Sequence, residues 1–178
     1  MGCQTISILH LAMRLTLWHY TRNARKGVVG TAREEHLEEV RTRVALDPFG
    51  DLLGFRVQEV SPGFARVVAT FEEKYLSWVG RAHGGWVMAL ADHAFSLASN
   101  TIPGTYVAVE FNINFVGTPE VGEEVTAQGH TVHQGKTLGV TVLEVRGKGG
   151  RLLATARGTA LAIGAARSTC PAGELPGA

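Results

Sequence analysis

The sequence predicts an α+β protein in which an antiparallel β-sheet wraps around one long central helix. Residues 84–99 form an apolar run with the length and composition of a buried helix. After this run, four strand-like segments follow one another with only short turns between them, which favours antiparallel pairing. Helical and extended segments do not alternate along the chain, and this excludes a doubly wound nucleotide-binding fold.

The segment before the central helix predicts a short surface helix followed by a hairpin. Thr31 and Glu34 have the spacing of a helix-capping box, and apolar residues then recur at helical spacing until Asp47-Pro48 ends the helix. Residues 55–60 and 65–71 are extended segments joined by a Ser-Pro-Gly turn. We therefore expect two antiparallel strands ahead of the central helix.

Residues 106–116 alternate between apolar and polar side chains and predict a half-buried strand. One face is expected to carry Val107, Val109, Phe111, Ile113 and Phe115, and the other Tyr106, Ala108, Glu110, Asn112 and Asn114. Residues 124–133, 138–146 and 152–163 complete the sheet. One face of the last strand carries only Ala and Gly, which would let another layer approach closely.

The length of 178 residues suits one domain, which we expect over residues 31–164. Residues 1–30 are interpreted as a disordered extension and residues 165–178 as a flexible tail rich in Pro, Gly and Ala. The apolar run 6–18 is too short to span a bilayer, so no membrane partner is expected. Its charges mostly follow the apolar run, which favours an extension over a targeting segment.

Charge and cysteine content narrow the partners and the compartment. Residues 1–33 hold five basic residues and no acid, so the rest of the chain is mildly acidic although the net charge is +1. An acidic body argues against nucleic acid as the main partner. Cys3 and Cys170 lie near opposite ends and form no metal-ligand spacing, which indicates a reducing, cytoplasmic setting.

Asp92 is the one carboxylate inside the apolar helical run. Burial of an unpaired carboxylate is costly and is normally avoided. One interpretation is an acid on the single solvent-exposed stripe of the helix. The other is a carboxylate held at a cleft, acting as a nucleophile or a general base.

His83-Gly84-Gly85 lies where this helix is expected to start. Glycine leaves the backbone N–H groups unobstructed at the positive end of the helix dipole, where they could stabilise a developing oxyanion. The tripeptide is equally consistent with a plain tight turn. Eight residues separate Gly84 from Asp92, about 12 Å along a helix. If both are catalytic, they must meet across a dimer interface.

The chain from about Leu53 to Gly164 resembles the hot-dog-fold acyl-CoA thioesterases of the phenylacetate-degradation type. The resemblance rests on LGFRVQEVSPGFARV, AHGGWVMALADHAFSLASN, NINF and HQGKTLGV, in the family's order. It implies a hydrolase with a sheet around a central helix, no cofactor, and an acyl-CoA substrate. It also implies a homodimer whose sheets join, often assembled into a homotetramer.

By position, the resemblance makes Asp92 the catalytic carboxylate, Gly84 the N–H donor to the thioester oxygen, and His83 a pocket residue. Ser77 stands where the family usually has Asn, and Ala108 and Val109 stand where some relatives have a helper hydroxyl. Substrate-binding positions are expected at Gly85, Asn112, Asn114, Gly135 and Lys136. The aromatic residues Trp78, Trp86 and Tyr106 suit an aryl or medium-chain acyl group.

The sequence also bears on four alternative functions. The GKT triplet has strands on both sides and lacks the phosphate-loop spacing, which excludes an ATP site. No histidine has a metal-ligand spacing, and His130 and His133 are expected on opposite faces of one strand. An acyl-thioester dehydratase and a non-catalytic acyl-CoA-binding protein stay open as alternatives, the second because of Ser77.

Overall fold

The computed structural model describes residues 32–44 and 46–164. The expectations for the extension 1–30, the tail 165–178, Thr31, Cys3 and Cys170 concern residues outside these ranges. The described helices are α2 (Ala32–Val44), α3 (Pro48–Leu53) and α4 (Gly84–Asn100), with short 3-10 turns η1 (Glu73–Tyr75) and η2 (Lys148–Gly150). The strands are β1 (Arg56–Ser61), β2 (Phe64–Thr70), β3 (Tyr106–Phe115), β4 (Glu124–Gln134), β5 (Leu138–Arg146) and β6 (Leu152–Ala162).

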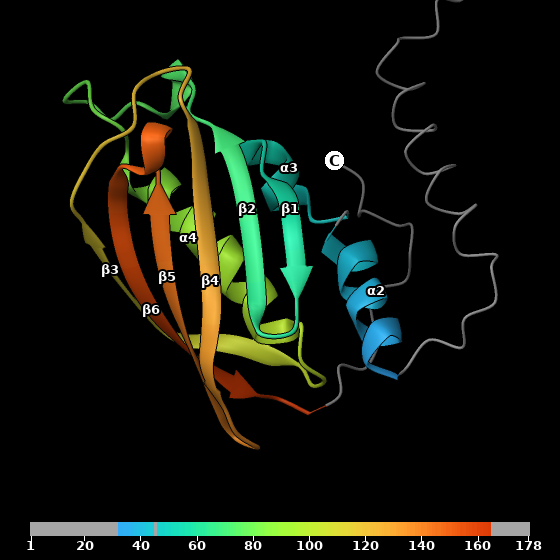
Figure 1. Cartoon of the computed structure of the whole chain (residues 1–178). Helices are drawn as coiled ribbons and strands as arrows, with labels where there is room; N and C mark the ends of the chain where they lie inside the picture. The colour runs from blue at the N-terminus through green and yellow to red at the C-terminus, as the bar shows by residue number, and fades with distance from the viewer. Residues whose placement is uncertain (1–31, 45, 165–178) are drawn as a thin grey trace, which may run out of the picture. The chain divides into compact units, whose positions relative to one another are not determined.

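The six strands form one antiparallel sheet in the order β1-β2-β4-β5-β6-β3. Helix α4 lies against one face of this sheet, and the strands curve around it (Figure 1). The predicted α+β architecture is confirmed. The prediction of one long apolar helix is confirmed as well, because α4 supplies most of the buried helical side chains.

The core lies between α4 and the concave face of the sheet. Its fully buried side chains include Val67, Leu90, Phe95, Val125, Val145 and Leu153. Two strand glycines bring the helix close: a Cβ atom on Gly129 would lie 3.2 Å from the Ala94 carbonyl oxygen, and one on Gly158 would lie 2.6 Å from the Phe95 ring. The small face predicted for the last strand therefore lets α4 pack tightly on the sheet.

Asp47-Pro48 begins a helix as well as ending one. Asp47 is the N-cap of α3, its carboxylate accepts a hydrogen bond from the Phe49 N–H at 3.1 Å, and Pro48 takes the first helical position. Both residue types are preferred at those positions. The sequence interpretation of this pair as a simple stop missed α3.

The predicted faces of residues 106–116 are wrong in part. The pairing of β3 with β6 shifts between Ala108 and Glu110, so Val109 is an extra residue in a β-bulge. Tyr106 consequently packs against the core on the same side as Phe111 and Ile113. The strand is also more exposed than predicted, because it forms an edge of the sheet.

A second bulge overturns the expectation for the two histidines of β4. The register with β5 shifts between Thr131 and His133. His130 pairs with Val142 and His133 pairs with Val140, and both partners lie on the face away from α4. The two histidines therefore share the convex face of the sheet.

Candidate functional site

Asp92 lies on the one solvent-exposed stripe of α4. The exposed positions of this helix recur at helical spacing, at Gly85, Met88, Asp92 and Ser96. The opposite side of the helix is buried on the sheet. Asp92 therefore lies outside the hydrophobic core.

A small pocket of about 190 Å³ lies beside Asp92, between α4 and the strands β3 and β6. Asp92 is exposed to solvent, although burial partly desolvates its carboxyl. Its lining residues are Asp92, Phe95, Ser96, Ser99, Tyr106, Val107, Ala108 and Ala160. The pocket thus combines one acid with three hydroxyl groups and an apolar wall.

The partial desolvation of Asp92 raises the pKa of its carboxyl above the ordinary value. The neighbouring His93 acts in the opposite direction and lowers this pKa, with a smaller effect. A carboxylate with a raised pKa is a stronger base than a free aspartate, which suits proton abstraction.

Asn100, the last residue of α4, fixes the wall of the Asp92 pocket. Its side-chain amide donates to the Ser96 and Tyr106 carbonyl oxygens at 2.9 Å, and its Oδ1 accepts from the Tyr106 N–H at 2.9 Å. The Tyr106 hydroxyl in turn donates to the Gly135 carbonyl oxygen at 3.1 Å. These bonds tie the start of β3 and the β4–β5 turn, with Gly135 and Lys136, to the helix.

The N-terminus of α4 presents one free glycine amide. His83 is the N-cap, and its Nδ1 accepts a hydrogen bond from the Gly85 N–H at 2.9 Å. Within the part of the chain that the structure describes, the Gly84 N–H has no acceptor. Of the two glycines, Gly84 is the one with a donor left for a ligand.

Ser77 closes the turn that leads into His83. Its backbone N–H and its hydroxyl both donate to the Arg81 carbonyl oxygen, at 2.7 and 2.8 Å. The hydroxyl proton of Ser77 is therefore committed to the loop. Trp78, on the same turn, is 97% exposed, whereas Trp86 is buried in an aromatic cluster.

Asn112 and Asn114 lie on the face of the sheet away from α4. Asn112 pairs with Arg157, and the next residue, Gly158, faces the helix, so Arg157 and Asn112 face the other way. The Asn114 amide donates to Asn112 Oδ1 at 3.3 Å. Within one chain these two side chains cannot share the Asp92 pocket. The structure thus groups His83, Gly84 and Gly85 at one end of α4, and Asp92 with Tyr106 and Gly135 toward the other.

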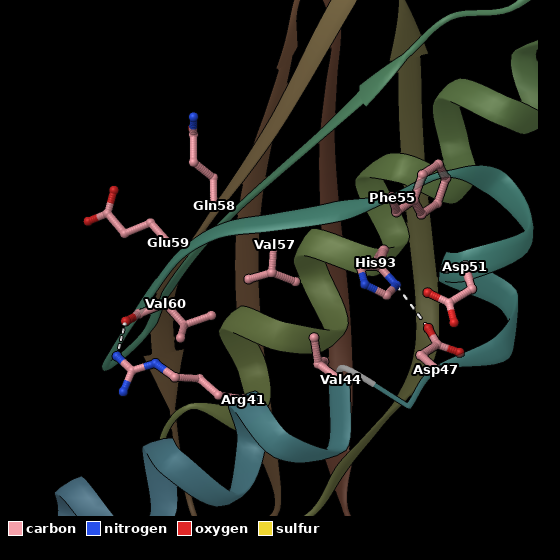
Figure 2. Close-up of a pocket in the computed structure, with 11 residues that line it drawn as sticks. Arg41, Val44, Asp47, Asp51, Phe55, Val57, Gln58, Glu59, Val60 and His93 are labelled. Atoms are coloured by element: carbon pink, nitrogen blue, oxygen red, sulfur yellow. Dashed lines mark hydrogen bonds and ion pairs between the residues drawn. The ribbon is translucent and has the colours of Figure 1, made fainter. Parts of the chain in front are cut away.

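A second pocket, of about 550 Å³, lies on another side of α4, between α2, α3 and β1 (Figure 2). His93 reaches from α4 toward Asp47, and His93 Nδ1 lies 3.2 Å from Asp47 Oδ2. Burial lowers the pKa of His93, while Asp47 and Asp92 act to raise it. This pair joins α3 to α4 and leaves Asp92 facing its own pocket.

A third pocket, of about 360 Å³, lies beside the N-terminus of α4. Most of its lining is apolar, and it contains Phe49, Leu53, Tyr75, Leu76, Trp86 and Ala89 together with Lys74, His83 and Gly85. In residues 32–44 and 46–164, no group of three or more acids, histidines or cysteines is arranged to hold a metal. None of the helices described is long and apolar enough to cross a membrane.

Sequence reasoning did not identify Ser96 or Asn100 as site residues. Ser96 follows Asp92 by four residues, which is the spacing that places two side chains on one helical face. That signal was present in the sequence. The role of Asn100 was not readable, because it depends on where β3 returns to the helix.

The fold is a hot-dog fold. Its central helix α4 begins with Gly84-Gly85 and carries Asp92, whose carboxyl has a raised pKa. Residues 79–154 match the thioesterase superfamily. The chain is 32% identical over 118 residues to the acyl-coenzyme A thioesterase PaaI of Escherichia coli, covering 66% of this chain and 84% of that protein. The chain belongs to the thioesterase superfamily and is a thioester hydrolase.

Solved structures share this fold. The E. coli PaaI protein from the phenylacetic acid degradation operon superposes with a TM-score of 0.71 at 28% identity, over 75% of this chain and 97% of that one. A Streptococcus mutans protein bound to acetyl-CoA superposes with a TM-score of 0.60 at 26% identity, over 62% of this chain and 89% of that one.

Proposed function

We propose that this chain hydrolyses acyl-CoA thioesters with Asp92 of one subunit and the Gly84 N–H of its partner. The relatives named as acyl-CoA thioesterases and the neighbour solved with acetyl-CoA support coenzyme A as the carrier of the acyl group. Asp92 acts as the general base, although its alternative role as the nucleophile is compatible with the same geometry. No metal or cofactor takes part in this mechanism.

One observation carries the proposal: Asp92 and Gly84 lie on the same helix, about 12 Å apart along its axis. A thioester carbonyl spans much less than this distance, so a single chain cannot place the base and the oxyanion donor on one substrate. Two antiparallel copies of α4, side by side, would bring the N-terminus of each beside Asp92 of the other.

The open edge of the sheet favours such an arrangement. β3 is a ten-residue edge strand, and one row of its backbone groups pairs with no other strand among residues 32–44 and 46–164. Its side chains Val107, Val109 and Phe115 are exposed. A long apolar edge strand normally pairs with another strand. Pairing two copies of β3 about a two-fold axis would join the sheets and place the two α4 helices antiparallel.

The chemistry then follows from the two groups. Ionised Asp92 takes a proton from a water molecule, and the water oxygen forms a bond to the thioester carbon. The carbonyl oxygen becomes an oxyanion, which accepts a hydrogen bond from the Gly84 N–H at the positive end of α4. The C–S bond then breaks, and the leaving thiolate takes the proton from Asp92. The products are a carboxylic acid and free coenzyme A.

The other predicted residues take supporting roles in this proposal. His83 holds the Gly85 N–H, which keeps the start of the helix in place and leaves Gly84 as the donor. Ser77 positions the turn before His83 through its bonds to Arg81. Lys136 and Gly135, on the turn tied to Tyr106, would meet the phosphates of coenzyme A. Asn112 and Asn114 could contact substrate only if the sheets of two subunits join and bring these side chains to the site of the partner subunit.

The apolar pocket at the start of α4 supports an aryl or medium-chain acyl group. Its volume of about 360 Å³ and its aromatic lining suit a ring or a short chain better than a long one. We also propose a homotetramer, because Val107, Leu138 and Leu161 are exposed cross-strand neighbours on the convex face. The few cysteines fit a cytoplasmic enzyme.

Gly84 offers a direct test, because it occupies the first position of α4. Proline is well tolerated there, and the extended backbone of His83 is compatible with a following proline. Gly84→Pro removes the N–H, whereas Gly84→Ala keeps the N–H and adds a similar first carbon near Phe115. Comparing these two variants isolates the hydrogen bond.

We expect Gly84→Pro to lower kcat by about 100- to 1000-fold relative to Gly84→Ala, the usual effect of removing one oxyanion donor. The assay is release of free thiol from aryl and medium-chain acyl-CoAs. Equal kcat for the two variants would remove Gly84 from the mechanism. Saturable binding without thiol release, or a hydrated or dehydrated acyl chain, would instead identify a binding protein or a dehydratase.

A further inference from the structure

Three hydroxyl groups line the Asp92 pocket, and the structure distinguishes them. The Tyr106 hydroxyl donates to the Gly135 carbonyl oxygen. Ser99 is buried, and its hydroxyl lies 3.1 Å from the hydroxyl of Thr141, which is itself 2.9 Å from that of Thr131. Both groups are therefore committed to holding the fold together.

Ser96 is the remaining hydroxyl. Its side chain is exposed, and in the part of the chain that the structure describes it has no side-chain hydrogen bond. It follows Asp92 by one turn on the same stripe, so the two side chains are neighbours about 6 Å apart along the helix. The strand positions opposite this pocket, Ala108 and Val109, supply no hydroxyl.

We propose that Ser96 is a further catalytic residue, which holds the water molecule that Asp92 activates. This inference rests on the function proposed above. The water donates one hydrogen to the Asp92 carboxylate and the other to Ser96 Oγ, which leaves an oxygen lone pair directed at the thioester carbon. The proton on the Asp92 side moves to the carboxylate, the C–O bond forms, and the C–S bond breaks as the thiolate takes that proton. Ser96 keeps its own proton throughout.

This arrangement explains why a carboxylate alone would be insufficient. A water with a single acceptor can rotate about that hydrogen bond, and most orientations do not point a lone pair at the substrate. A second acceptor one helical turn away fixes the orientation. The pocket of about 190 Å³ has room for a water molecule, whose share of liquid volume is about 30 Å³.

The test compares Ser96→Ala, Ser96→Thr and Asp92→Asn with the double variant Asp92→Asn/Ser96→Ala, in the full chain, by thiol release. We expect Ser96→Ala to lower kcat about tenfold with KM unchanged, the usual size of one lost hydrogen bond. Ser96→Thr, which retains the hydroxyl, restores most of kcat. In the Asp92→Asn background, Ser96→Ala has no further effect, because both residues act on the same water.

Three results would overturn the role of Ser96: wild-type kcat in Ser96→Ala, an equal loss in Ser96→Thr, or an additive loss in the double variant. Each leaves the proposed function in place as long as Asp92→Asn is inactive. Full activity of Asp92→Asn alone would instead refute the proposed function itself.

Discussion

Gly158 on β6 determines how closely α4 can approach the sheet, and replacing it with alanine should destabilise the protein. A Cβ atom at this position would lie 2.6 Å from Cε2 and 2.7 Å from Cζ of Phe95. Ordinary contact begins at about 3.4 Å, so the ring would have to withdraw by about 0.8 Å. Phe95 is 1% exposed and packs on Phe111, so moving the ring would disturb its contact with Phe111.

The magnitude follows from two opposing effects. Overpacking a tight core costs about 1–3 kcal/mol. Replacing glycine with alanine lowers the entropy of the unfolded chain and returns about 0.4–1 kcal/mol. We therefore expect Gly158→Ala to lower the free energy of unfolding by about 1.3 kcal/mol, or the Tm by about 4 °C. Because Phe95 also lines the Asp92 pocket, kcat should fall as well.

The assay is thermal and urea unfolding at one fixed protein concentration, since assembly would make Tm depend on concentration. Gly139→Ala on β5 is the matched control, because its Cβ would come no closer than 3.4 Å to any other atom. This control should stay within about 1 kcal/mol of the wild type. A Gly158→Ala protein as stable as the control would refute the tight packing of α4 on β6.

Three further predictions concern charge and hydrogen bonding around α4. The raised pKa of Asp92 contributes stability at low pH, and this contribution is lost as the pH rises through that pKa. Asp92→Asn should therefore have a higher Tm than wild type at pH 7. The difference in Tm should shrink as the pH falls. The same shift places the acid limb of the kcat/KM profile above the ordinary aspartate value of 3.8. The lowered pKa of His93 acts the other way, giving stability that is lost as the pH falls through that pKa. Asp47→Asn keeps the helix cap but removes the charge that acts to raise this pKa, so its unfolding free energy should match wild type at pH 8. The unfolding free energy of the variant should fall below that of the wild type as the pH drops through the folded-state pKa of His93, which lies under 6.5. Asn100→Ala deletes the bonds that hold Tyr106 and should cost about 2 kcal/mol in chemical denaturation, whereas an unchanged midpoint would show that this link is unimportant.

Local patterns in the sequence were sufficient to predict α4 and the strand β6 that packs against it. The apolar run 84–99 has only one solvent-exposed stripe, so its length and composition identify a buried helix. The small residues of β6 predicted that another layer could approach this strand closely. Gly158 confirms this, because the Phe95 ring of α4 lies where a Cβ atom at position 158 would be. Asp47-Pro48 carries a readable signal for α3, because Asp followed by Pro is a typical helix start as well as a stop for the preceding helix.

The faces of β3 and β4 could not be predicted from alternation. One extra residue, at Val109 in β3 and at Val132 in β4, reverses the side on which every later residue lies. The sequence continues to alternate through both bulges, because each bulge depends on the register with a neighbouring strand. Tyr106 and Ala108 consequently lie on the same side as Phe111, and His133 lies on the convex face.

Asp92, Gly84 and His83 could be chosen from sequence, because their chemistry depends on their positions along one helix. The separation of about 12 Å followed from spacing alone. Sequence alone could not show that the Gly85 N–H donates to His83 or that the Ser77 hydroxyl donates to the Arg81 carbonyl oxygen. Those bonds support Gly84 as the proposed donor, because they leave its N–H without an acceptor among the described residues, and they tie Ser77 to the loop.

Subunit mixing tests the shared site most directly. Asp92→Asn and Gly84→Pro subunits, each inactive alone, are mixed in equal amounts and allowed to exchange. Random pairing about a two-fold axis makes about half of the dimers mixed, and each mixed dimer holds one site with Asp92 and Gly84 both intact. We expect thiol release to recover to about a quarter of the wild-type rate. Exchange confirmed by mass, with no recovered activity, would contradict a site shared between two chains.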